Sequence, residues 1–248
     1  MIALPYCGAA PLPGELLTRF NLDPVLIAAL VAAVCLQVWW TGGTTTRRQK
    51  MASVMGWLVA SAALISPLCA LSVALFSARV AQHMTLVLIA APLIAFGMAG
   101  RQSRSGWPLG LAALAFFAAL WFWHMPWPYE ATSTSVSVYW CMHVSLFGSA
   151  VWLWRELLHH PSTRTVEALL AGALTSIQMG LLGAMLSLAD HGLFSWHLTR
   201  TWPFGLTPLE DQQLGGVIMW VPGIALFLWV AVRSLARLWS SLEGARTV

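Results

Sequence analysis

The sequence predicts an all-α fold, a polytopic membrane bundle of about seven helices, and three observations support this prediction. Of the 248 residues, 58% are hydrophobic and only 9% are charged, whereas a soluble domain usually carries about 25% charged residues. The 15 tryptophans and 10 phenylalanines suit the aromatic belts at the two interfaces of a membrane. Most charged residues lie in short connections between long apolar segments. We therefore expect one integral membrane domain over residues 1–248.

Seven segments are apolar and long enough to cross a hydrocarbon core of about 30 Å, which takes about 20 helical residues. In order along the chain, they are Pro24–Trp40, Met51–Phe76, Val80–Ala99, Leu109–Met125, Val136–Trp154, Val166–Leu188 and Leu214–Leu235. The second is long, and Pro67 is expected to kink it or end it early. Before this bundle of residues 24–235, we expect residues 1–23 to form an irregular, retained tail, since prolines interrupt them and they lack the basic start of a secretion signal. Residues 236–248 are expected to form a C-terminal tail.

The distribution of basic residues predicts the orientation of the bundle. All lysines and arginines except Arg19, Arg79 and Arg200 lie after the first, third and fifth spans or at the C-terminal end. Because basic residues stay in the cytoplasm, the N-terminus and its tail are expected outside, and the C-terminus and its tail inside. The connection over residues 189–210 then lies outside, as a lid over the outer mouth. The basic residues form no stripe, so we expect no nucleic-acid partner.

Three histidines inside the predicted spans each have a methionine as a neighbour. The pairs are His83-Met84, His124-Met125 and Met142-His143. A titratable group inside a membrane is costly and is a functional candidate. At about 1.5 Å of rise per residue, all three histidines fall in the outer third of the membrane, so we expect them to converge on a metal. Imidazole and thioether ligands suit copper, and thioethers favour Cu(I).

The three methionines cannot all face the same point as the histidines. Adjacent residues on a helix diverge by about 100°, so one or two of Met84, Met125 and Met142 are candidates for additional ligands. The alternative interpretation is that each histidine hydrogen-bonds to a neighbouring helix and that each methionine fills a gap in the packing. The sequence leaves both interpretations open.

A second cluster of unusual residues opens the seventh span on its outer side. Asp211 is expected either to cap the helix or to help a cation reach the bundle. Gly215 and Gly216 allow close approach of a neighbouring helix, and Pro222 is expected to loosen the helix in mid-membrane. Met219 faces the outer half and is a further candidate ligand.

Arg79 is a basic residue just before the third predicted span. It precedes His83 by four residues and shares its face of the helix. We consider three roles for it: an ion pair with Asp211 or Asp190, contact with an anionic group such as a lipid phosphate, or extension of its side chain to the membrane interface.

The cysteines show no recognisable motif. None of them forms a CxxC pair, so neither a thioredoxin-like nor a zinc motif is predicted. Cysteines in apolar stretches are expected to be small buried residues, as for Cys35, whereas Cys141 lies two positions from His143 and close to the candidate site. The four are Cys7, Cys35, Cys69 and Cys141. No set of nucleophile, base and orienting residue is visible, so no enzyme is expected.

Several of these stretches resemble the CtaG-type cytochrome c oxidase assembly factors, over roughly residues 20–240. The resembling stretches are Ala81-Gln-His83-Met84 with Ala91-Pro92-Leu93, Trp123-His124-Met125-Pro126 with Tyr129, His143, and Asp211-Gln-Gln-Leu-Gly-Gly-Val-Ile-Met219-Trp220. The resemblance implies a seven-span protein of the bacterial inner membrane that is required to make active haem-copper oxidase. It also implies a role at copper insertion, with oxidase subunits, a periplasmic copper donor and membrane lipid as partners.

Three other functions stay open. A copper permease would need polar groups through the inner half, where only Gln37, Ser176 and Gln178 are candidates. A haem-binding protein would use two of the histidines as axial ligands. A metal-free scaffold for oxidase subunits would use its polar residues only to join helices.

Overall fold

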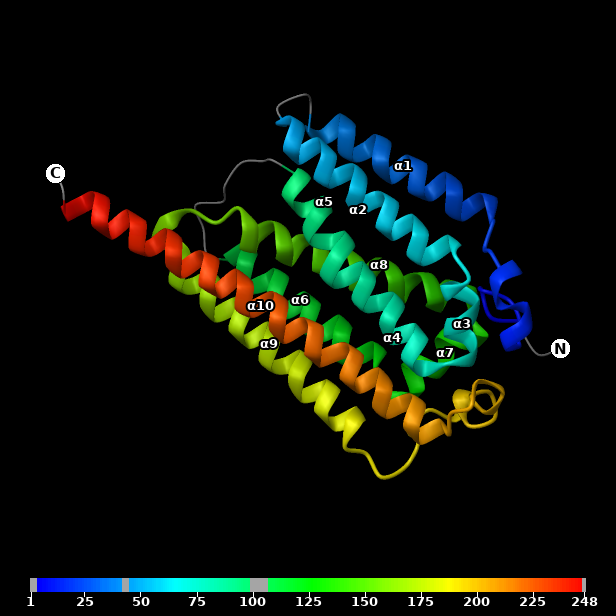
Figure 1. Ribbon diagram of the computed structural model, residues 1–248. Coiled ribbons are helices and arrows are strands. Elements are labelled where there is room, and N and C mark those ends of the chain that lie inside the picture. Colours follow the sequence, from blue (N-terminus) through cyan, green and yellow to red (C-terminus); the bar gives the residue numbers. More distant parts are fainter. Residues whose placement is uncertain (1–3, 42–44, 99–106, 247–248) are drawn as a thin grey trace.

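Figure 1 shows a computed structural model of the chain, which describes residues 4–41, 45–98 and 107–246. Within these ranges the regular structure is helical. The longer elements are α1 (Pro24–Thr41), α2 (Arg47–Ile65), α3 (Leu68–Ala74), α4 (Phe76–Met84), α5 (Ala91–Gly97), α6 (Trp107–Trp123), α7 (Pro126–Thr134), α8 (Val136–Leu158), α9 (Thr165–Ser187) and α10 (Pro208–Arg246). A π-helical segment, η2 (Thr85–Ala90), joins α4 to α5. Four short 3-10 turns are Pro13–Thr18, Ser162–Arg164, Ser195–His197 and Trp202–Phe204.

The number of candidate spans agrees with the sequence when bent helix pairs are counted. In the described ranges, 5 helices are long and apolar enough to cross a membrane, or up to 7 if each of two bent pairs forms one span. The pairs are α2 with α3, bent by 47°, and α6 with α7, bent by 75°. The predicted limits of the first, fifth and sixth spans lie within a few residues of α1, α8 and α9.

The second predicted span is wrong in its limits, the fourth ends two residues earlier than predicted, and a proline explains each break. The helix expected over Met51–Phe76 ends at Ile65 and resumes as α3 after Pro67, as that proline predicted. The fourth span was expected to reach Met125, but α6 ends at Trp123. Met125 is extended, the conformation that a residue before proline prefers, and α7 then leaves at a new angle.

The third and seventh spans also differ from the prediction. The third begins at Phe76 rather than Val80, and its predicted end, Ala99, lies outside the described residues. The last helix begins at Pro208 rather than Leu214 and continues to Arg246, so most of the expected tail of residues 236–248 is helical. Residues 247–248 lie outside the description, as do residues 1–3 of the N-terminal tail.

The N-terminal tail, two short helices and a long loop lie together at one end of the bundle (Figure 1). Helices α9 and α10 lie side by side, and the C-terminal end of α10 projects beyond the other helices (Figure 1). At the other end lie the N-terminal tail, α3, α7 and the loop that joins α9 to α10 (Figure 1). Helix α1 packs loosely against the bundle: only 17% of its 18 residues are buried.

Candidate functional site

The three histidines come together near the end of the bundle that carries the N-terminal tail. His83 lies in the last turn of α4, His124 at the bend between α6 and α7, and His143 in the second turn of α8. Their exposed fractions are 3%, 6% and 5%. The ring centroid of His83 lies 6.3 Å from that of His124 and 5.3 Å from that of His143. His83 therefore contacts the rings of both other histidines, whereas convergence on a metal stays a prediction.

The spacing of the rings is close to that of a three-imidazole metal site. With a metal–nitrogen bond of about 2.1 Å, three imidazoles spaced evenly around one ion have ring centroids about 5.5 Å apart. The two centroid distances, 5.3 and 6.3 Å, lie on either side of this value. In the described ranges, however, no group of three or more His, Cys, Asp or Glu side chains is already placed to hold a metal ion. The rings would have to reorient to bind one.

Hydrogen bonds determine which ring nitrogen of His124 and of His143 is left free to bind a metal. Nδ1 of His124 donates to the carbonyl oxygen of Leu120 at 2.7 Å, and Nδ1 of His143 donates to that of Tyr139 at 3.1 Å. A neutral imidazole that donates through Nδ1 keeps a lone pair on Nε2. Metal-bound histidines commonly donate their other nitrogen in this way. Nε2 of His143 is buried and has no hydrogen-bond partner.

His83 is the least satisfied polar side chain of the site. Both of its ring nitrogens are buried without a hydrogen-bond partner. An unpaired buried polar atom costs about 1–3 kcal/mol, so such an arrangement needs an explanation. The π-helical segment begins two residues later, at Thr85. Segments of this kind are frequent at functional sites, where they change the facing of side chains.

The methionines differ from one another, as the helical geometry predicted. Met84 and Met219 lie in the main core, and Met142 packs in a small cluster with Trp123 and Tyr139. Met125 is 51% exposed at the bend after α6. Met84, Met142 and Met219 thus stay candidates for a ligand role inside the bundle, whereas Met125 in this conformation faces the surroundings.

Asp211 is buried, and its carboxylate accepts hydrogen bonds from a helix other than its own. Its Oδ2 accepts the backbone N–H of Phe76 at 2.6 Å, and its Oδ1 accepts the N–H of Ser77 at 3.1 Å and the Ser77 hydroxyl. These are the first N–H groups of α4, whose own N-cap residue, Leu75, provides no side-chain cap. A carboxylate at a helix N-terminus satisfies free N–H groups and complements the helix dipole. Asp211 therefore caps α4, rather than the helix that contains it.

Arg79 has neither of the predicted acidic partners. It is only 2% exposed, so its side chain does not extend to the interface. Its guanidinium donates to the carbonyl oxygen of Ser72 and to the hydroxyls of Thr132 and Ser133, and it lies 4.8 Å from the ring centroid of Tyr129. Among the described residues, no carboxylate forms an ion pair with it. A positive charge is thus fixed one turn from His83.

The loop between α9 and α10, which was expected to form a lid, packs against this end of the bundle. Phe194 stacks on Phe76 with ring centroids 4.5 Å apart. His197 is buried, donating through Nδ1 to the carbonyl oxygen of Ala74 and accepting from the hydroxyl of Tyr129 at 2.7 Å. Burial and the charge of Arg79 lower the pKa of His197 from 6.5 to about 3.

This neutral histidine makes the stability of the loop depend on pH. Below pH 6.5 the unfolded chain takes up a proton at His197, whereas the folded chain stays neutral down to about pH 3, so stability falls as the pH falls through this window. When the pH is lowered from 7.5 to 5, we expect the wild type to lose about 2 kcal/mol more unfolding free energy than a His197→Gln variant. Chemical unfolding in mixed micelles measures this difference. An equal pH dependence of the two proteins would contradict a neutral, buried His197.

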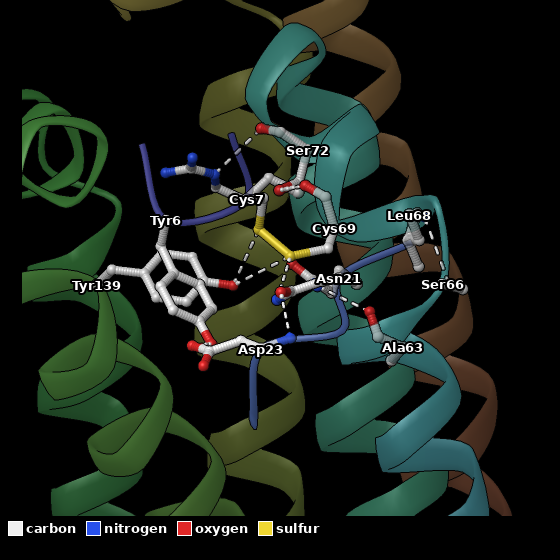
Figure 2. The surroundings of a disulfide bond; sticks show 12 residues. Tyr6, Cys7, Asn21, Asp23, Ala63, Ser66, Leu68, Cys69, Ser72 and Tyr139 are labelled. Atoms are coloured by element: carbon white, nitrogen blue, oxygen red, sulfur yellow. Dashed lines mark hydrogen bonds between the residues drawn. A yellow bond between two sulfur atoms is a disulfide. The ribbon is translucent and has the colours of Figure 1, made fainter. Parts of the chain in front are cut away.

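A disulfide that the sequence did not predict lies beside the hydroxyl of Tyr139 (Figure 2). Cys7 of the N-terminal tail and Cys69 of α3 are bonded across a separation of 62 residues. Cys35 and Cys141 are free and exposed, so the expectation of a small buried residue is wrong for Cys35. Disulfide pairing has no local signal here, because the partners are neighbours only once the tail and α3 have packed.

Two of the three polar residues considered for a transport path, Gln37 and Gln178, join helices. Gln37 donates to the carbonyl oxygen of Ile94 and accepts from the indole of Trp57. Gln178 accepts from the indole of Trp121 at 2.8 Å. These bonds connect neighbouring helices, which is the usual role of amides in membrane bundles. They give no support to a polar path through the inner half.

Comparison with known proteins gives one finding. The family model of the cytochrome c oxidase caa3 assembly factor, Caa3_CtaG, matches residues 28–241. This match covers most of the chain, including the three histidines and Asp211. No curated protein and no solved structure matches the chain.

Proposed function

We propose that this chain, which belongs to the family of cytochrome c oxidase caa3 assembly factors, holds copper at His83, His124 and His143 and assists its insertion into the oxidase. The role is that of a carrier rather than an enzyme. Copper is the cargo, and oxidase subunits and a periplasmic copper donor are the proposed partners.

The observation that carries this proposal is the state of His83. It lies in ring contact with both other histidines, and its two nitrogens have no partner. If the cluster were only structural, hydrogen bonds between the helices would be expected to satisfy these atoms. A copper ion that takes one nitrogen from each ring removes part of the cost of the unpaired groups. The hydrogen bonds at Nδ1 of His124 and His143 leave their Nε2 atoms available for this ion.

The charge next to the site favours the monovalent ion. Arg79 places a fixed positive charge one helical turn from His83, without an acidic partner among the described residues. Its repulsion of Cu²⁺ is twice its repulsion of Cu⁺ at the same distance. Thioether ligands, if Met84, Met142 or Met219 contribute, act in the same direction. We therefore propose Cu(I), with Asp211 positioning α4 rather than binding the ion.

We propose that the site faces the outer side of the bacterial inner membrane. The basic residues favour a cytoplasmic C-terminus. The Cys7–Cys69 disulfide lies next to Tyr139, whose ring packs on His143, and disulfides persist in oxidising compartments such as the periplasm. A reporter fused to the C-terminus that proved active only in the periplasm would overturn this orientation.

Copper binding tests the proposal directly. We expect the purified, disulfide-bonded protein to bind one Cu(I) per chain in an anaerobic titration against a chromophoric chelator. Replacing His83 by alanine is expected to weaken binding at least 100-fold, because one of three ligands is lost. His191→Ala is the matched control, since this histidine lies in the loop and is exposed.

The outcomes separate the alternative functions. A Soret band in the protein as isolated would indicate haem instead of copper. A protein that binds no copper, and that still supports normal oxidase activity in cells after all three histidines are replaced, would indicate a metal-free scaffold. Copper uptake into vesicles that is lost in His83→Ala would indicate a permease.

A further inference from the structure

We propose that Cys7 and Cys69 form a second, redox-controlled copper site, which loads the imidazole trio. As a disulfide the pair holds no copper. As two thiols it binds Cu(I) and passes the ion to His143 by ligand exchange. This inference deepens the proposed function and rests on it for the receiving site.

One tyrosine connects the disulfide to the trio. The hydroxyl of Tyr139 lies 3.5 Å from Sγ of Cys7 and 3.9 Å from Sγ of Cys69. Its ring packs on that of His143 with centroids 4.2 Å apart, and its carbonyl oxygen accepts the Nδ1 proton of the same histidine. Figure 2 shows the ring of Tyr139 between the disulfide and α8. The two sulfurs and the imidazole of His143 are therefore separated by a single side chain.

The two sulfurs differ in a way that suits thiol–disulfide exchange. Cys7 is half-buried, whereas Cys69 is completely buried. An attacking thiolate therefore reaches Cys7 first, and Cys69 leaves. Sγ of Cys69 accepts a hydrogen bond from the side-chain amide of Asn21 at 3.5 Å. A donor at the leaving sulfur stabilises the thiolate that forms, which speeds exchange.

The exchange balances with an external protein dithiol as the reductant. One thiolate of this dithiol attacks Cys7 and forms a mixed disulfide, and Cys69 departs as a thiolate. The second thiol of the reductant then attacks the reductant's first sulfur, which is bonded to Cys7 in the mixed disulfide, and Cys7 is released as a thiolate. The external dithiol has lost two electrons and become a disulfide, and Cys7 and Cys69 have gained them. Binding of Cu(I) then releases any proton that the two sulfurs have taken up.

The N-terminal tail keeps the two cysteines close after reduction. Next to Cys7, the ring of Tyr6 packs on Tyr139 and Trp140, with centroids 4.9 and 5.0 Å apart, and its hydroxyl donates to Asp23 at 2.5 Å. The Cα atoms of the two cysteines are 5.5 Å apart. Two thiolates at this spacing can share one ion, and thiolates select Cu(I).

Cu(I) stoichiometry in the two redox states tests this site. The experiment uses the full chain with Cys35 and Cys141 replaced by serine, so that the pair provides the only thiols. In anaerobic Cu(I) titrations, we expect one ion per chain in the oxidised protein and two in the reduced protein. Replacing Cys7 or Cys69 by serine is expected to leave one ion in both states. Alkylating the reduced protein with iodoacetamide should have the same effect without a change in sequence.

The failure of this proposal is distinguishable from the failure of the proposed function. A variant with His83, His124 and His143 replaced by alanine is expected to bind no copper when oxidised and one ion when reduced. Equal stoichiometry in the oxidised and reduced proteins would overturn the cysteine site. A second ion that survives in Cys7→Ser or after alkylation would also overturn it. An oxidised protein that binds no copper would overturn the trio instead.

Discussion

Replacing Asp211 by alanine is expected to destabilise the protein by about 2–4 kcal/mol, because the backbone N–H groups of Phe76 and Ser77 would lose their buried acceptor. Helix α4 has no side-chain cap of its own, so the loss is not compensated locally. The favourable interaction of the carboxylate with the dipole of α4 is lost as well. Unfolding with denaturant in mixed micelles measures the change.

A smaller change at the same contact provides the control. Ser77→Ala removes the hydroxyl that donates to Asp211 but leaves both backbone hydrogen bonds, so we expect a loss of about 1 kcal/mol. The double variant should lose less than the sum of the two single variants, because both changes remove the same hydroxyl–carboxylate interaction. Wild-type stability in Asp211→Ala would contradict the capping role.

The same variant separates a ligand from a positioning residue. Helix α4 carries Arg79 and His83, and its N-terminus is held by Asp211. If Asp211 positions α4, copper affinity and stability should fall together in Asp211→Ala. If Asp211 binds copper, affinity should fall in Asp211→Asn by a larger factor than the change in stability explains. Because both carboxylate oxygens of Asp211 accept hydrogen bonds from α4, we expect copper affinity and stability to fall together.

The proximity of the histidines could be predicted from depth, but their orientation could not. The distance of His83, His124 and His143 from the predicted span ends requires only the rise per residue. Which ring nitrogen is free depends on the rotation of each helix and on local hydrogen bonds, such as that from His143 to Tyr139. No sequence pattern fixes these features. The unpartnered state of His83 appears only in the structure.

The features that sequence analysis missed depend on contacts between distant segments. Pro67 and Pro126 are local signals, yet the sizes of the bends, 47° and 75°, follow from packing. Asp211 was expected either to cap its own helix or to help a cation reach the bundle, and neither expectation pointed to the N-terminus of α4, which is 135 residues away in the sequence from Asp211 to Phe76. The Cys7–Cys69 bond joins a tail without periodicity to an apolar segment, and nothing in either stretch indicates the other.

Replacing Gly216 by alanine is expected to cause the second large loss of stability, because α9 and α10 touch through their backbones there. A Cβ atom on Gly216 would lie 2.6 Å from the carbonyl oxygen of Gly183 and 2.8 Å from the backbone nitrogen of Ser187. These atoms belong to a helix and cannot move separately from it. The helices would have to separate, which also weakens the hydrogen bond from Ser187 to the carbonyl oxygen of Gln213. We expect a cost of about 3 kcal/mol, at the upper end of overpacking.

Gly180 is the matched control for this contact. It lies on the same helix as Gly183, three residues away, and an added Cβ meets no atom within 4 Å. Gly180→Ala should therefore cause no loss of stability, and the higher helix propensity of alanine is expected to add up to about 1 kcal/mol. If both variants unfold at or above the wild-type denaturant concentration, the close packing of α9 and α10 is contradicted. If only Gly216→Ala is destabilised, the close packing is supported. Asp211 lies about one and a half turns from Gly216 along α10 and holds the N-terminus of α4, the helix that carries His83. If Gly216→Ala also loads less copper at equal protein level, the separation of α10 from α9 displaces Asp211 and, through it, α4.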